Sequence, residues 1–201
     1  MDRVEHDDMS DVRLLGVEAV CQRIEDHEIE DTKELEHVAS TLCRLLKTAT
    51  TDGSEKDEAL LVATINCLTR IVDPMQETGI TFESATKRLI FESIIDKIRL
   101  GNGKVCFAAL GFWMGLGDMV ELRSYLDNPD DNENELSPTA VLMQSIVDVI
   151  KTNINLNAAG DNNINHESVN VVKVATTILN EIVFCIDSKY LEPLEVQDTV
   201  M

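Results

Sequence analysis

The order of apolar and polar residues along the chain predicts helices throughout. Between Ser10 and about residue 188, Leu, Ile, Val and Ala recur at intervals of three and four residues, the spacing of one helix face. No stretch alternates apolar and polar residues convincingly enough to predict a strand. The pattern therefore predicts an all-α protein of about seven or eight helices.

Local signals set the expected ends of these helices. Ser10 is the expected cap of a first helix that reaches about Glu28, with Val12, Leu15, Ala19, Val20 and Ile24 near helical spacing. The D-x-x-E pair of Asp31 and Glu34 predicts the start of a second helix, which runs to about Thr48. Later helices are predicted between Ser54 and Asp73-Pro74, from Thr81 or Ser84 to Gly101, over 105–117, from Asp118 to about Leu126, from Ser137-Pro138 to Asn153, and over about 166–188.

The segment 105–117 holds no charged residue and contains the only tryptophan, Trp113. It is shorter than the roughly 20 residues that a membrane-spanning helix needs. A helix that is apolar all round must be surrounded by protein, so the segment predicts a helix buried on nearly all sides. Gly111 and Gly115 lie four residues apart and would let neighbouring helices approach closely.

Polar stretches between the helices indicate the domain organisation. Residues 1–9 are acidic and predict a disordered start, while 127–136 predicts a mobile acidic linker. The Asn-rich stretch 153–165 predicts a loop, and 189–201 predicts a polar tail. We expect a single domain over 10–188, and the polar ends fit a fragment of a longer protein slightly better than a whole one.

Charge and cysteine usage limit the classes of partner and the compartment. With 37 Asp and Glu against 17 Lys and Arg, the net charge of -20 repels the phosphate backbone and disfavours nucleic acid. The five cysteines lie in apolar segments without a C-x-x-C pair, which argues against a disulfide framework or a zinc site. The acidic start is unlike a signal peptide. The sequence predicts a reducing compartment, cytosol or nucleus, and no membrane segment.

A search for catalytic and metal motifs leaves one candidate. Glu34-Leu-Glu-His37 fits the E-x-x-H pair of di-iron helical bundles, but such sites need a second E-x-x-H, which the chain lacks. His37 is therefore expected on the surface of its helix. No G-x-S-x-G elbow or glycine-rich phosphate loop occurs. The sequence predicts no enzyme and no cofactor, with an all-α metal-binding protein or enzyme as the alternative.

Helix starts recur along the chain. Those near residues 11, 55 and 103 are separated by roughly 44 and 48 residues, and each opens an apparent pair of helices. This spacing resembles the HEAT and armadillo helical repeats over 10–188, on period and pairing alone and without a repeat consensus. The resemblance implies antiparallel helix pairs in an irregular α-solenoid or helical bundle. It also implies a groove between helices that binds a partner helix or an extended peptide.

A second resemblance lies at the start of the apolar segment. The run Asn102-Gly103-Lys104, followed by Gly111 and Trp113, is similar to the first homology motif of the B-cell-lymphoma apoptosis regulators, where Asn-Trp-Gly-Arg opens an apolar central helix. The motif's tryptophan is missing here, and no second tryptophan-bearing motif or hydrophobic anchor follows. This resemblance implies, as an alternative, a helical bundle whose groove binds an amphipathic helix.

Two charged features are candidate binding surfaces. The acidic segments Glu25–Asp31 and Asp127–Glu135 could steer a basic partner. The one basic-leaning stretch supplies the candidate partner-binding residues, which are Lys87, Arg88, Lys97, Arg99 and Lys104. Together these features predict a non-catalytic scaffold or adaptor that binds another protein.

Overall fold

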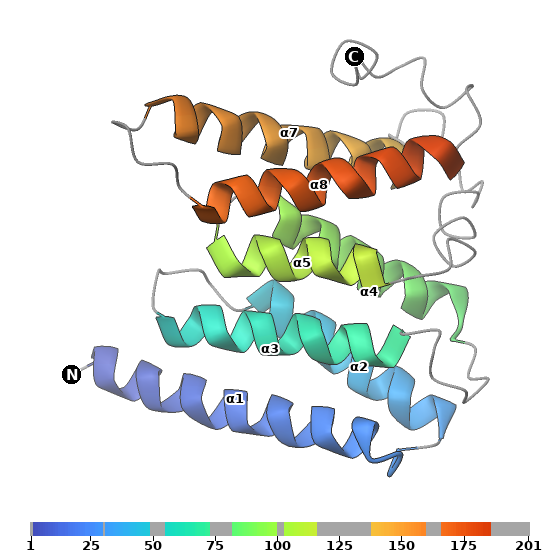
Figure 1. The fold of residues 1–201 in the computed structure, drawn as a ribbon. Coiled ribbons are helices and arrows are strands. Elements are labelled where there is room, and N and C mark those ends of the chain that lie inside the picture. Colours follow the sequence, from blue (N-terminus) through green and yellow to red (C-terminus); the bar gives the residue numbers. More distant parts are fainter. Residues whose placement is uncertain are drawn as a thin grey trace. The chain divides into compact units, whose positions relative to one another are not determined.

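Helices make up the structure, a computed structural model that describes residues 2–29, 31–48, 55–72, 82–99, 103–115, 138–159 and 166–185. These ranges hold seven helices and no strand, which confirms the predicted all-α class. The helices are α1 (Asp2–Glu25), α2 (Thr32–Thr48), α3 (Glu55–Val72), α4 (Ser84–Ile98), α5 (Gly103–Gly115), α7 (Pro138–Ala159) and α8 (His166–Cys185) (Figure 1).

The chain divides into two compact units, where the sequence predicted a single domain. The first unit is Met1–Ile94 and the second is Ile95–Met201, so the boundary falls inside α4. Each unit has buried apolar side chains of its own. The two units are therefore described separately.

In the first unit, α1 packs along α3, and the two helices lie side by side in Figure 1. Near the start of both, the Ser10 hydroxyl donates to Asp57 Oδ1 at 2.7 Å, across a separation of 47 residues. Near the end of both, Arg70 Nε lies 3.3 Å from Glu25 Oε1, at almost the same separation. When contacts at both ends of two helices join residues with nearly the same separation in sequence, the two helices must run in the same direction. The α1–α3 pair is thus parallel and in register.

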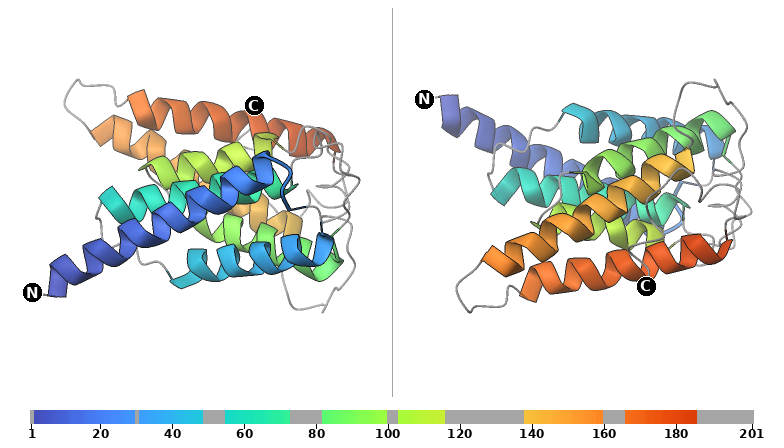
Figure 2. Two further views of the ribbon diagram at one scale, coloured as in Figure 1. Left: turned by 90° about the horizontal axis from the view of Figure 1, so that it is seen from below. Right: turned by 90° about the horizontal axis from the view of Figure 1, so that it is seen from above.

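Helix α1 begins earlier than the sequence predicted. It starts at Asp2, so residues 2–9 are helical instead of disordered, and the predicted cap at Ser10 is wrong. The Ser10 side chain is buried and directed at Asp57, so it cannot cap its own helix. In Figure 2 the first turns of α1 extend beyond α3.

The turn between α1 and α2 follows a known helix-ending pattern. The Glu28 N–H donates to Arg23 O at 2.9 Å and the His27 N–H donates to Ile24 O at 3.1 Å, the two bonds of a Schellman motif. The motif places His27 in the left-handed region, with φ at 55°. Asp31 Oδ1 then accepts the Lys33 N–H at 2.9 Å, which confirms Asp31 as the cap of α2.

Replacing His27 with glycine is expected to stabilise the first unit. A side chain in the left-handed region costs about 1 kcal/mol relative to glycine, and His27 is exposed, so no packing is lost. Urea unfolding followed by circular dichroism should show a higher midpoint for His27→Gly. The control His27→Ala keeps the strain and should not gain stability. Equal midpoints for the two variants would contradict the assignment of backbone strain to His27.

Helices α2 and α4 are also linked in the first unit. The backbone N–H of Glu83, just before α4, donates to Glu36 Oε1 of α2 at 2.8 Å, again across 47 residues. Further along, the Cys43 thiol of α2 is hydrogen-bonded to Ser93 of α4. Equivalent helices of two successive pairs are therefore in contact, α1 with α3 and α2 with α4.

In the second unit, α7 and α8 pack side by side and run in opposite directions (Figure 1), and α5 packs against α8. The predicted start at Pro138 is confirmed. The predicted loop 153–165 is wrong in its first half, because α7 continues to Ala159. The buried Asn153 amide donates to Val149 O at 2.9 Å, so it is satisfied within its own helix. The rest of that loop, the predicted helix 118–126, the linker 127–136 and the tail 189–201 lie outside the described residues.

Candidate interaction surfaces

Helix α5 is exposed along one face, which corrects the prediction of burial on nearly all sides. Leu110, Phe112 and their neighbours are buried, but Phe107 is 44% exposed and Met114 is 47% exposed. Gly111 is exposed between them, and a Cβ placed there would meet no atom within 4 Å. Gly111 therefore does not hold two helices together. The lack of charge in α5 indicates its apolar character but not which side is covered.

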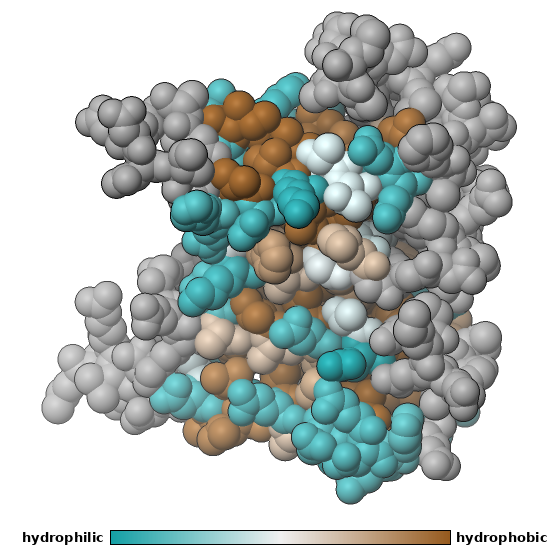
Figure 3. Space-filling view, in the orientation of Figure 1, coloured by the Kyte–Doolittle hydropathy of each residue, from teal (hydrophilic) through white to brown (hydrophobic). Residues whose placement is uncertain are grey.

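A second exposed apolar face lies on α1. We name Val12, Leu15, Gly16 and Ala19 the α1 outer stripe, since their spacing places them on one side of the helix. Val12 is 69% exposed and Leu15 is 65% exposed, and a Cβ at Gly16 would meet nothing within 4 Å. The buried Val17 lies on the opposite side. In Figure 3, brown atoms interrupt the teal along α1.

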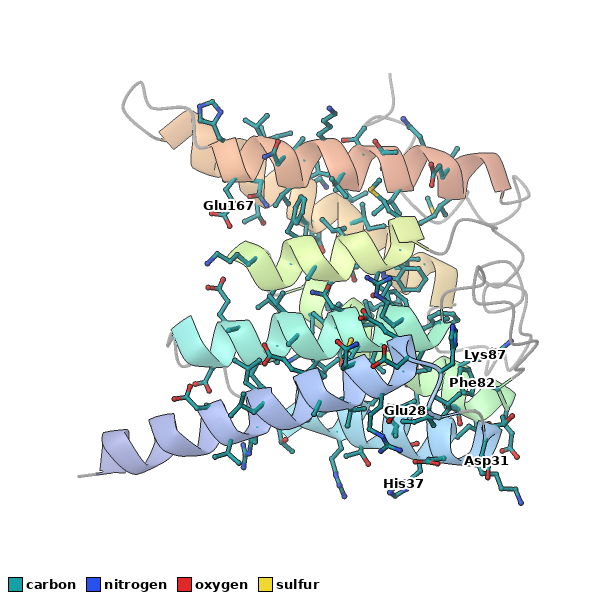
Figure 4. The ribbon with its side chains drawn as sticks, turned by 60° about the horizontal axis from the view of Figure 1, so that its bottom comes forward. Glu28, Asp31, His37, Phe82, Lys87 and Glu167 are labelled. Atoms are coloured by element: carbon teal, nitrogen blue, oxygen red, sulfur yellow. The ribbon has the colours of Figure 1, made fainter. Side chains whose placement is uncertain are left out.

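The first unit contains two of the five predicted partner-binding cations. Lys87 and Arg88 lie in the first turns of α4, and both are half-buried. Arg88 Nε lies 2.8 Å from Glu92 Oε1, one helical turn further along. The positive charge of Arg88 is thus compensated locally. Figure 4 shows Lys87 near Phe82, the residue that precedes α4 by two positions.

The other three cations belong to the second unit. Arg99 Nη1 lies 3.7 Å from Asp96 Oδ1, and Arg99 Nε donates to Ser145 Oγ of α7 at 3.1 Å. Burial lowers the pKa of the Lys97 ammonium, although Asp96 acts in the opposite direction. Lys104 is exposed in the first turn of α5, on the same face as Phe107. Of the three, Lys104 is the one beside an exposed apolar face.

Glutamates of the acidic segment Glu25–Asp31 form ion pairs with arginines of the protein itself. Besides the Glu25–Arg70 pair, Arg23 Nε lies 3.3 Å from Glu28 Oε2 and Arg23 Nη2 lies 3.5 Å from Glu34 Oε1. Figure 4 shows Glu28 and Asp31 at this turn. These side chains are about half exposed, so each pair contributes about 0–1 kcal/mol. The second acidic segment, 127–135, lies outside the described residues.

Two of the cysteines meet at the α1–α3 contact. Cys21 of α1 is half-buried and is hydrogen-bonded to the fully buried Cys67 of α3. Burial raises the pKa of Cys67 to about 12, with smaller contributions from Cys21 and Glu25. Burial and then Glu25 raise the pKa of Cys21, while the Cys67 thiol and Arg70 lower it. The sequence reasoning treated these cysteines as separate apolar residues and missed the pair. One signal was available in the sequence: helix starts recur at roughly 44 and 48 residues, and Cys21 and Cys67 are separated by a similar distance along the chain.

The E-x-x-H candidate does not lead to a metal site in the described part of the chain. His37 is exposed on the outer side of α2 (Figure 4). Within the seven described ranges, no three His, Cys, Asp or Glu side chains are grouped so that they could hold a metal ion. No helix there is both long enough and apolar enough to cross a membrane.

No protein-family model, curated protein or solved structure matches this chain. A proposal for its function therefore rests on the surfaces and contacts described above.

Proposed function

We propose that the protein is a non-catalytic scaffold or adaptor that docks a helix of another protein on the α1 outer stripe. The carrying observation is that Val12 and Leu15 are both exposed by about two thirds on a helix whose opposite side is packed against α3. Single exposed apolar residues are common. Here, however, apolar residues follow one another at helical spacing on an ordered helix.

The chemistry of the stripe suits a partner helix. Residues at i, i+3, i+4 and i+7 form one continuous face of α1, against which the apolar face of a partner helix can pack. Val12 and Leu15 supply apolar contact, and Gly16 lets a partner backbone approach because it has no side chain. The exposed Arg13 and Glu18 flank the stripe on its two sides and would select for charge in the partner.

We further propose a helical-repeat module of the HEAT or armadillo type, on the recurring helix starts near residues 11, 55 and 103. Hydrogen bonds join α1 to α3 and α2 to α4 at the same separation of 47 residues, as stacked repeats require. In such a module a groove between helices and its rim give further contacts. The candidate partner-binding cations stay proposals in each unit separately, Lys87 and Arg88 in the first unit and Lys97, Arg99 and Lys104 in the second. We place the protein in the cytosol or nucleus, where its thiols stay reduced.

The proposal is tested by affinity capture from native cell lysate with wild type and Leu15→Asp. Burying a new carboxylate in an apolar interface should weaken partner affinity at least about tenfold. The matched control is Ile154→Asp, since Ile154 is an exposed apolar residue on α7, outside the stripe. Circular dichroism should show both variants folded. The proposal fails if Leu15→Asp retains the same proteins as wild type, or if wild type enriches none.

A further inference from the structure

We propose that Cys21 and Cys67 form a redox-responsive pair, which a low-molecular-weight disulfide converts to a disulfide bond that cross-links α1 to α3. The inference rests on the α1–α3 contact and does not depend on the proposed function. It concerns two thiols that the docking surface does not use, because Cys21 lies on the side of α1 that faces α3.

The geometry of the parallel pair places the two sulfurs together. The two thiols are hydrogen-bonded to each other. Toward the start of the helices, the Ser10–Asp57 hydrogen bond of 2.7 Å fixes the register, and toward the end the Glu25–Arg70 pair of 3.3 Å does so. The residues of each of these two contacts are separated in sequence by nearly as many positions as Cys21 and Cys67 are. The thiol pair therefore lies between two contacts that fix the register of α1 against α3.

Exposure sets the order of the chemical steps. Cys21 is half-buried and can meet a small reagent, whereas Cys67 is fully buried. The Cys21 thiolate attacks one sulfur of the reagent RS–SR, the S–S bond breaks, and RS⁻ leaves. The Cys67 thiolate then attacks the Cys21 sulfur and displaces the second RS⁻. The protein loses two thiol hydrogens and two electrons, and the reagent is reduced to two thiols.

The electrostatics slow the oxidation of the pair near neutral pH. Burial raises the pKa of both thiols, and Glu25 on α1 raises both further. On α3, Arg70 and the Cys67 S–H favour the Cys21 thiolate. Because the thiolate is the nucleophile, the reaction is slow near pH 7 and accelerates about tenfold per pH unit until Cys21 titrates. The pair is therefore oxidised during long exposure to a disulfide reagent and stays largely reduced during a short one.

Oxidation should stabilise the first unit. A disulfide that closes the long loop from Cys21 to Cys67 restricts the unfolded chain and so stabilises the folded one. We expect the thermal unfolding midpoint of the first unit to rise by roughly 10 °C. The midpoint should return to its starting value after treatment with a thiol reductant.

The test uses the purified full chain incubated with oxidised glutathione at about pH 8.5, well above neutrality so that more thiolate is present. Intact mass should fall by the mass of two hydrogens, and peptide mapping should show Cys21 joined to Cys67. Cys43→Ala should still cross-link, whereas Cys21→Ser should neither cross-link nor gain thermal stability. An unchanged mass, a glutathione adduct on Cys21 without a cross-link, or a bond between other cysteines would each overturn the inference.

Discussion

Truncation of Phe112 to alanine is expected to lower the free energy of unfolding of the second unit by about 3–5 kcal/mol. Phe112 is buried on α5, and its ring meets Trp113 edge to face with centroids 5.5 Å apart. Helix α5 packs against α8, so removing the ring leaves a cavity among side chains that cannot all move inward. An edge-to-face contact of this kind adds to the loss.

The matched control is Phe107→Ala on the same helix. Phe107 lies on the exposed face of α5, so its truncation should change the free energy of unfolding by less than about 1 kcal/mol. Urea unfolding can be followed by fluorescence of Trp113, the only tryptophan, with circular dichroism as a second probe. Equal losses for the two variants would show that α5 does not have the buried and exposed faces described.

The second large effect is expected for Ser10→Ala, which should cost about 1–3 kcal/mol of stability in the first unit. Ser10 and Asp57 are both buried, and the hydroxyl donates to the carboxylate at 2.7 Å. Removing the hydroxyl withdraws one donor from a carboxylate that water cannot easily reach. The cost comes from desolvation of Asp57 more than from the lost bond itself.

A double-mutant cycle separates this coupling from general damage. Ser10→Ala, Asp57→Ala and the double variant should be compared by urea denaturation, and the double variant should lose less than the sum of the single variants. Thr48→Ala is a suitable control, because its hydroxyl is exposed and donates to the backbone carbonyl of Arg44 within its own helix. Strict additivity in the cycle would contradict the predicted coupling.

Helix boundaries were predictable where the signal is local. The cap at Asp31, the end of α3 before Pro74 and the start of α7 at Pro138 each depend on residues within a few positions of the boundary. A proline or a capping carboxylate acts on the backbone beside it, whatever the rest of the chain does. Such features can be inferred from one sequence.

Predictions failed where a polar residue has a partner that spacing does not reveal. Local sequence indicates a helix cap at Ser10, but in the structure its hydroxyl donates to Asp57. Asn153 is typical of a loop, but its amide donates to a carbonyl oxygen of the preceding turn of the same helix. Both are polar residues inside long helices, where tertiary burial or a bond to the preceding turn overrides local preference. Helix propensity alone cannot separate these cases.

The candidate surfaces show the same limit. Val12 and Leu15 fit the helical period of α1, so the sequence predicted the helix but could not tell that these residues face outward. Helix α1 has apolar residues on two opposite sides, and only packing against α3 decides which side is covered. The Cys21–Cys67 pair was equally out of reach of local reasoning, since it depends on the parallel register of two helices.

The parallel α1–α3 pair also bears on how the protein is made. During synthesis α1 emerges before α2 and α3, so the surface that covers Val17 and Ile24 does not exist until those helices have followed. Most of the stability of a helix in a protein comes from tertiary packing, so α1 lacks its main stabilising contacts until α3 forms. Contacts between distant segments are slow to form, and the waiting helix shows apolar residues on both sides. Of these three helices, α1 is thus translated before the others but packs only when α3 has formed, and until then its apolar residues are available to a chaperone.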